Sequence, residues 1–208
     1  MELNDKEYWE NYYKKNFKPS EPSTFAHFAS SYIKNNKKLI ELGCGNGRDS
    51  IFFSKKNLKV LGIDRAENEI KFLNENYSND KLIFFADDFT NLNLDEKFDY
   101  IYSRFTFHSI DEEKENRTLD WITSNLKENG MFFLEARSIK DPMYEKGKKI
   151  SKNENFTDHY RRYMDLNDIV IKLKNRNMSI VYSIESDGLA IYEDDDPVVI
   201  RLIAKIKK

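Results

Sequence analysis

The sequence predicts a single α/β domain over residues 1–208, built on a mainly parallel sheet with an antiparallel hairpin at one edge. Up to residue 137, short apolar segments alternate with amphipathic ones, which is typical of strands joined by crossover helices. The last third instead carries two apolar runs joined by a polar stretch that is too short for a helix. With 208 residues and 39% hydrophobic content, the chain suffices for one core and not for two.

The expected elements follow one another along the chain. Residues 1–36, with the aromatic residues Tyr8, Trp9, Tyr12, Tyr13 and Phe17, are expected to form a helical cap over the binding edge of the sheet. Parallel strands are expected at 38–43, 59–64, 82–86, 98–104 and 131–137. Helices are expected at 48–56, 67–77 and 111–128, the last ended by Asn129-Gly130. A long segment, 137–165, replaces a compact connection and is expected on the substrate side, before the hairpin of 178–185 and 198–206.

Composition and charge exclude several classes of function. The 34 Lys and Arg residues nearly balance 36 Asp and Glu residues, so no basic surface for nucleic acid is expected. No run approaches the roughly 18 apolar residues of a membrane span, and the first residues lack the apolar core of a signal peptide. The only cysteine, Cys44, leaves no disulfide and no cysteine-based metal site. We therefore expect a soluble, cytoplasmic protein without a bound metal.

Three alternate glycines, Gly43, Gly45 and Gly47, join the first strand to the following helix. Glycine at such a junction lets the backbone turn sharply and lets a ligand approach the amide groups. A plain glycine turn is the alternative, and it is less compatible with three glycines in this position. A dinucleotide-binding loop would have its third glycine where Arg48 stands. Arg48, between Glu41 and Asp49, suits a ligand without pyrophosphate, such as S-adenosylmethionine, which carries a net positive charge.

Acidic residues also end the next two strands. Asp64 closes the second strand, where a carboxylate accepts hydrogen bonds from both hydroxyls of a ribose. Asp87-Asp88-Phe89 follows the third strand, at the place where an adenine would lie. Taken singly, Asp64 is equally compatible with a helix N-cap and Asp88 with a turn. Together with Glu41 they indicate a ligand at the switch point of the sheet.

These motifs resemble those of class I S-adenosylmethionine-dependent methyltransferases. Glu41-Leu-Gly-Cys-Gly-Asn-Gly47 matches the glycine-rich motif, Gly62-Ile-Asp64 the ribose position, Ala86-Asp-Asp-Phe89 the adenine position and Phe98-Asp-Tyr-Ile-Tyr102 the fourth-strand motif. The resemblance implies a Rossmann-like sheet of seven strands with the last antiparallel. It implies S-adenosylmethionine as cofactor and S-adenosylhomocysteine as product. The residues expected to bind the cofactor are Tyr13, Glu41, Gly43, Gly45, Arg48, Asp49, Asp64, Asp88, Phe89 and Arg104.

Candidate substrate residues lie after the fourth and fifth strands. His108 is a candidate general base, because its unperturbed pKa of roughly 6.5 suits proton transfer at neutral pH. A histidine that binds backbone or packs on the cofactor is an equally good interpretation. A second group is expected to recognise phosphate or carboxylate, or alternatively to form an exposed basic turn paired with Asp158 and Asp165. That group comprises Arg137, His159, Arg161, Arg162 and Tyr163.

Five segments together resemble a narrower group of small methyltransferases of bacterial cell-surface polysaccharides, including those that act on the O-methyl phosphoramidate group of capsules. They are Pro22–Ala26, Gly47–Ser50, Arg104–His108, Arg137–Asp141 and His159–Tyr163. This resemblance implies an oxygen acceptor on a small, anionic, sugar- or nucleotide-linked molecule.

Other functions stay open at this point. They are a thiol or metalloid methyltransferase and a non-catalytic S-adenosylmethionine-binding partner subunit. A nicotinamide dehydrogenase is disfavoured by Arg48, and nucleic-acid methylation by Ser103-Arg-Phe-Thr-Phe107 after the fourth strand. The sequence leaves the oligomeric state undetermined.

Overall fold

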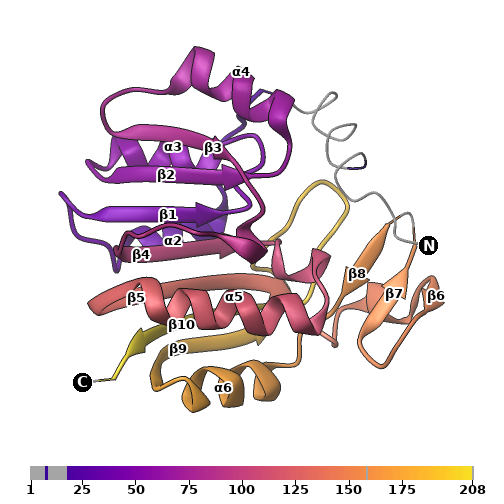
Figure 1. Cartoon of the computed structure of the whole chain (residues 1–208). Coiled ribbons are helices and arrows are strands. Elements are labelled where there is room, and N and C mark those ends of the chain that lie inside the picture. The colour runs from indigo at the N-terminus through magenta and orange to yellow at the C-terminus, as the bar shows by residue number, and fades with distance from the viewer. Residues whose placement is uncertain (1–7, 9–17, 158, 208) are drawn as a thin grey trace.

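The computed structural model describes residues 8, 18–157 and 159–207. Its main sheet has seven strands in the order β3-β2-β1-β4-β5-β10-β9 (Figure 1). The strands β1 to β5 run parallel, and β10 pairs antiparallel with both β5 and β9. The prediction of a mainly parallel seven-stranded sheet with an antiparallel C-terminal hairpin is confirmed. The strands are β1 (Lys38–Leu42), β2 (Lys59–Asp64), β3 (Leu82–Ala86), β4 (Phe98–Arg104), β5 (Leu126–Arg137), β9 (Met178–Ser186) and β10 (Val199–Ile206).

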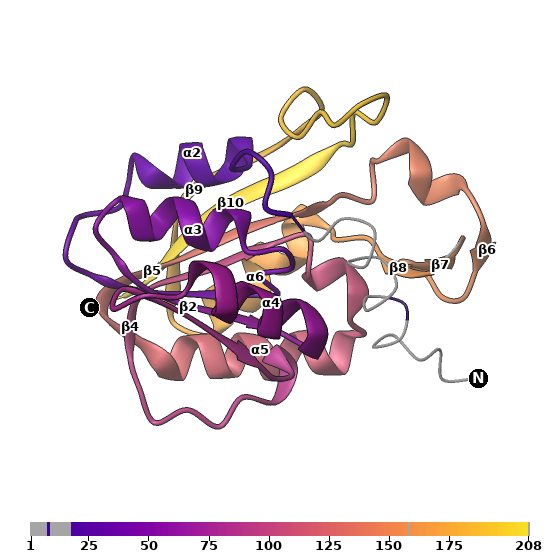
Figure 2. The ribbon, with the colours of Figure 1, turned by 90° about the horizontal axis from the view of Figure 1, so that it is seen from above.

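Helices cover both faces of the sheet (Figure 2). On one face lie α2 (Thr24–Ser30), α3 (Arg48–Lys55) and α4 (Glu67–Tyr77), and on the other α5 (Glu112–Asn125) and α6 (Leu166–Asn175). Each helix places its apolar residues on one side, as Leu119 and Ile122 of α5 show. The helix α6 was not among the elements expected from sequence. With helices on both faces, the central strand β1 is buried along Leu39–Leu42, which explains why every residue there except Glu41 is apolar.

The helix expected over 111–128 is three residues shorter at its C-terminal end, so the predicted boundary is wrong. The helix α5 ends at Asn125, and Leu126 already pairs with Phe98 as the first residue of β5. Asn129 adopts a left-handed φ of 62° inside β5, where the register with β4 shifts. A Cβ on Gly130 would lie 2.9 Å from the Lys127 carbonyl oxygen. The Asn-Gly pair therefore forms an irregularity in a strand, not a helix stop.

The segment 137–165 forms a small antiparallel sheet beyond the carboxyl ends of the main strands (Figure 1). Its strands are β6 (Lys148–Lys149), β7 (Glu154–Phe156) and β8 (Tyr160–Arg162), preceded by the 3₁₀ helix η3 (Pro142–Glu145). The buried side-chain amide of Asn155 donates to the carbonyl oxygens of Tyr144 and Lys146, which ties β7 to the η3 segment.

The expected cap differs from the structure in its described part. The helix α2 lies on the face of the sheet beside α3, and among the residues of α2 only the first, Thr24, reaches the binding edge. Trp9, Tyr12, Tyr13 and Phe17 lie outside the described residues. None of the helices within the described ranges has the length and apolar character needed to cross a membrane.

The packing of the sheet predicts that truncation of two apolar side chains has very different effects on the free energy of unfolding. Leu134 in β5 is completely buried, whereas Ile83 in β3 is 56% exposed. We expect Leu134→Ala to lower the free energy of unfolding by about 2–5 kcal/mol, because it leaves a cavity between the two helix layers. Ile83→Ala, the matched control, should change it by about 0.5 kcal/mol or less. Urea denaturation followed by circular dichroism measures both; equal effects would contradict this description of the core.

Candidate functional site

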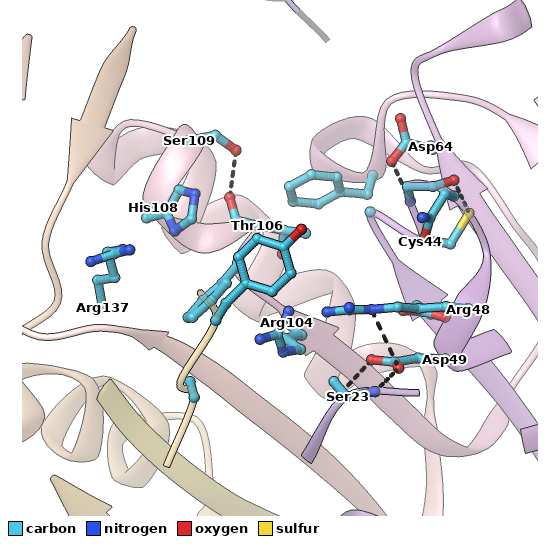
Figure 3. Close-up of a pocket in the computed structure, with 18 of the residues that line it drawn as sticks. Ser23, Cys44, Arg48, Asp49, Asp64, Arg104, Thr106, His108, Ser109 and Arg137 are labelled. Atoms are coloured by element: carbon cyan, nitrogen blue, oxygen red, sulfur yellow. Dashed lines mark hydrogen bonds and ion pairs between the residues drawn. The ribbon is translucent and has the colours of Figure 1, made fainter. Parts of the chain in front are cut away.

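A pocket of about 630 Å³ opens where the parallel strands end (Figure 3). Residues that follow the carboxyl ends of β1 to β5 line it, together with the segments 18–24 and 190–195. This edge is where open α/β sheets bind ligands. In Figure 3 the glycine loop, Asp64 and Asp49 lie on one side of the pocket, and His108 and Arg137 on the other.

The glycine loop between β1 and α3 is held by backbone hydrogen bonds to the neighbouring strand β2. The amides of Gly43 and Cys44 both donate to the carbonyl oxygen of Ile63, each at 2.8 Å. Gly43 has a φ of 73°, and a Cβ there would lie 2.1 Å from Cγ2 of Thr106. Glycine is therefore required at this position for conformation and for space.

Four acidic side chains line the glycine-loop side of the pocket: Glu41, Asp49, Asp64 and Asp88. Asp64 accepts hydrogen bonds from the amides of Gly45 (2.9 Å) and Ala66 (3.0 Å), so it fixes the loop. Burial raises the pKa of Asp64, and these hydrogen bonds oppose that rise. Burial, followed by the charge of Asp49, raises the pKa of Glu41 well above its usual range.

Asp88 has a local structural role as well. Its carboxylate accepts from the amide of Thr90 (2.9 Å) and caps the 3₁₀ helix η1 (Phe89–Asn91). The turn interpretation of Asp88 is thus correct, yet Asp88 and Phe89 also line the pocket. Arg48 and Arg65 line the same side, where they are outnumbered by carboxyl groups, and an acidic excess of this kind favours a ligand of net positive charge.

The expected cofactor residue Asp49 binds protein groups. Its buried carboxylate accepts from the amide and hydroxyl of Ser23, each at 2.7 Å, and from the hydroxyl of Tyr102 at 2.8 Å. Ser23 is also the N-cap of α2, so Asp49 attaches the segment before α2 to the start of α3. Asp49 still lines the pocket, and Arg48 beside it donates to the hydroxyl of Ser20 at 3.3 Å.

Arg104 is oriented by the sheet itself. Its Nε donates to the completely buried carboxylate of Glu135 at 2.8 Å. The next residue, Phe105, has a left-handed φ of 55°, and its ring centroid lies 4.2 Å from the Arg104 guanidinium. This strained turn places Arg104 and Phe105 as adjacent walls of the pocket, between the glycine loop and His108.

The opposite side of the pocket is basic. It is lined by His108 of the 3₁₀ helix η2 (Phe107–Ser109), by Arg137 at the end of β5 and by His159 and Arg161 near or in β8. Burial, followed by the charges of Arg137 and Arg161, lowers the pKa of His108 well below its ordinary value. His108 is therefore neutral at neutral pH, and its buried Nδ1 has no hydrogen-bond partner among the described residues.

Two contacts fix the remaining basic residues of this side. The imidazole of His159 stacks on the ring of Tyr8 with the centroids 4.5 Å apart. The Arg161 guanidinium binds the hydroxyl of Thr157. The sequence singled out six catalytic or substrate-binding candidates, and the structure brings four of them together in this pocket: His108, Arg137, His159 and Arg161.

Arg162 and Tyr163 do not line this pocket, so their predicted role as substrate residues is corrected. The Arg162 guanidinium is buried against the carboxylate of Glu115 in α5. The ring of Tyr163 is buried and packs edge-on against Tyr144 at 5.4 Å. Successive residues of a strand point to opposite faces, so in β8 only Arg161 faces the pocket.

Several lining residues escaped the sequence analysis. Ser23 and Thr106 have no motif of their own, and their roles depend on contacts with Asp49 and Gly43. The loop between β9 and β10 also lines the pocket, because the strand order brings it beside β5. Its pocket-lining residues are Ala190, Ile191, Tyr192 and Asp195. Only the run of acidic residues at 193–196 distinguished this loop in the sequence.

Comparison with known proteins adds to this geometry. A curated relative, "Probable S-adenosyl-L-methionine-dependent methyltransferase TehB" of Haemophilus influenzae, is 33% identical over 94 residues, covering 44% of this chain and 32% of the relative. The chain thus spans less than a third of the length of the first curated relatives that it matches, 28% and 32%.

Solved structures share the fold over nearly the whole chain. An S-adenosylmethionine-dependent methyltransferase of Clostridium acetobutylicum superposes with a TM-score of 0.67 at 17% identity, covering 89% of this chain and 92% of the other. The glycopeptide N-methyltransferase MtfA in complex with S-adenosylhomocysteine gives a TM-score of 0.70 at 13% identity, covering 91% and 92%. A family model described as "Methyltransferase domain" matches residues 33–183, well over half of the chain. The chain therefore belongs to the methyltransferase domain family and has the fold of S-adenosylmethionine-dependent methyltransferases.

Proposed function

We propose that the protein transfers the methyl group of S-adenosylmethionine to an oxygen of a small anionic acceptor that carries phosphate or phosphoramidate or is linked to a sugar. The observation that carries this proposal is the division of one pocket into an acidic side at the glycine loop and a basic side around His108. The acidic side suits the net positive charge of the cofactor. The basic side suits an acceptor with negative charge.

The residues present fit S-adenosylmethionine. Its chemistry supplies a methyl group on a positively charged sulfur, which an acceptor oxygen takes in an in-line displacement. Asp64 and Asp88 would hold the ribose and adenine parts, and Glu41 and Arg104 the amino-acid part. The glycine loop would bring its backbone close to the ligand, since Gly43 and Gly45 have no side chains there.

The chain's own contribution to the reaction is mainly alignment. Positioning the two reactants in the correct geometry lowers the activation barrier by about 7–11 kcal/mol without acid or base chemistry. Arg137 and Arg161 would hold the anionic group of the acceptor through charge-assisted hydrogen bonds. A phosphate-type oxygen is already ionised, so His108 would form a polar wall beside the acceptor without removing a proton.

The biological setting we propose is the modification of capsule or other surface polysaccharides. The segments Arg104–His108 and His159–Tyr163 resemble those of small methyltransferases of that class, and an anionic sugar-linked acceptor agrees with the basic side of the pocket. A neutral thiol acceptor would make no charge-assisted hydrogen bonds with the arginines there. Turnover with a thiol or a metalloid acceptor alone would contradict the proposal.

The glycine loop yields a test of the cofactor assignment. In Gly43→Ala the new Cβ meets Thr106 at 2.1 Å and the backbone φ of 73° is strained, so the loop must move. We expect the affinity for S-adenosylhomocysteine to fall at least about tenfold, since a left-handed non-glycine residue alone costs roughly 1–2 kcal/mol. Isothermal titration calorimetry measures this affinity.

Gly188→Ala is the matched control for that experiment. Gly188 has nearly the same φ, 70°, but a Cβ there has nothing within 4 Å. It should therefore keep the affinity of the unaltered protein for S-adenosylhomocysteine. If Gly43→Ala binds as well as Gly188→Ala, the glycine loop does not hold the cofactor as proposed.

Variants of Arg161 and His108 distinguish an ionised acceptor from a neutral one. We expect Arg161→Ala to raise the KM for a phosphate-bearing acceptor by roughly 10- to 150-fold, because the variant loses a hydrogen bond between charged groups. The KM for S-adenosylmethionine should stay unchanged. His108→Ala should cost much less in kcat than the roughly 10²–10⁴-fold of a lost general base.

The pH dependence of kcat provides the discriminating readout. A general base must be deprotonated to act, so kcat would fall when acidification protonates His108. Because the pKa of His108 is lowered, this fall would occur only at a pH below the ordinary pKa range of histidine. The proposal expects the pH profile of kcat to have no acidic limb that depends on His108. A base-sized loss in His108→Ala, together with disappearance of that limb, would show that the acceptor is a hydroxyl group that needs deprotonation.

A further inference from the structure

Arg137 binds two carboxylates, and the two differ in character. Its Nη1 donates to Asp141 at 2.8 Å, and its Nη2 binds Asp195. The side chain of Asp141 is 1% exposed and that of Asp195 is 45% exposed, while Arg137 itself is 10% exposed. One side of the guanidinium is therefore enclosed by protein, and the other is closed by a carboxylate that water reaches.

Asp141 is part of the local fold. Its second carboxylate oxygen accepts from the amide of Met143 at 2.7 Å and caps η3, and its own amide donates to the Ser138 carbonyl oxygen at 3.0 Å. Removing Asp141 from Arg137 would break this turn. For Asp195, by contrast, Arg137 is the only side-chain partner within the described part of the chain.

Asp195 belongs to a compact tip of the loop between β9 and β10. Two backbone hydrogen bonds of 2.9 Å join Tyr192 and Asp195 in both directions and close the turn. The base of the loop is fixed elsewhere, since the Leu189 carbonyl oxygen accepts from Arg201 and Thr24, each at 2.6 Å. The amide of Gly188 also donates to the carboxylate of Asp196 at 2.8 Å, which joins the tip to the base. Rotation of the Asp195 side chain alone therefore releases Arg137 and leaves all these hydrogen bonds in place.

We propose that Asp195 is an internal counter-ion that occupies the anion-binding side of Arg137 and is displaced by the acceptor. This inference rests on the proposed anionic acceptor. An acceptor with a phosphate group brings charge-assisted hydrogen bonds that replace those of Asp195, whereas a neutral molecule cannot compensate for the broken pair. Asp195 is therefore a specificity-determining residue: it weakens binding of every acceptor and excludes those without sufficient negative charge.

The test measures binding of inorganic phosphate to the complex with S-adenosylhomocysteine by isothermal titration calorimetry. We expect Asp195→Asn to raise the phosphate affinity about tenfold, since one competing charge-assisted hydrogen bond is removed. Asp194→Asn is the control, because it removes the same charge from the preceding residue, whose side chain does not line the pocket. It should leave the phosphate affinity unchanged, and both variants should keep the affinity for S-adenosylhomocysteine.

A double variant checks that the effect passes through Arg137. Combining Arg137→Gln with Asp195→Asn should abolish the gain in phosphate affinity. If phosphate binds the unaltered protein and Asp195→Asn leaves that affinity unchanged or lowers it, the counter-ion proposal is wrong and the anionic acceptor stands. If phosphate binds neither the unaltered protein nor Asp195→Asn while S-adenosylhomocysteine binds both, the anionic acceptor and the counter-ion both fail.

Discussion

The pocket depends on one buried carboxylate, that of Glu135 in β5. The sheet register places it directly between Arg104 of β4 and Arg201 of β10, and both guanidinium groups bind it. A buried carboxylate without partners would cost several kcal/mol, so these three residues must remain together. Arg201 also donates to Thr24 and to the Leu189 carbonyl oxygen. One cross-strand row of charges thus joins the start of α2, the end of β4 and the loop between β9 and β10.

The consequence is a pocket whose walls come from distant parts of the chain but are held in one arrangement. Asp64 fixes the glycine loop, Asp49 fixes Ser23, and Glu135 fixes Arg104. Each of these carboxylates is buried and shapes the binding surface through its hydrogen bonds. On the basic side, the guanidinium of Arg161 binds the hydroxyl of Thr157 and lines the pocket together with Arg137 and His159. The pocket therefore has carboxyl groups on the side of the glycine loop and guanidinium and imidazole groups on the opposite side.

The sequence predicted the fold where local patterns determine it. The bounds of β2, α4, β3 and β4 agree with the prediction, since each is a short apolar strand or an amphipathic helix with clear ends. The strands β6 to β8 have two or three residues and carry no periodicity, so only the position of the insertion was predicted. For the same reason the sequence could not tell Arg161 from Arg162. Asp195 and Arg201 reach the site only through the strand order, which a linear pattern does not contain.

The central claim is that an anionic acceptor lies on the basic side of a pocket whose acidic side holds the cofactor. The most direct test is a crystal structure of the complex with S-adenosylhomocysteine, soaked with arsenate as a phosphate analogue that is located by its anomalous scattering. The account predicts arsenate within hydrogen-bond distance of Arg137 and Arg161, with Asp195 displaced from Arg137. Arsenate bound at Arg48 or elsewhere outside this side of the pocket, or absent beside a fully bound cofactor product, would contradict it.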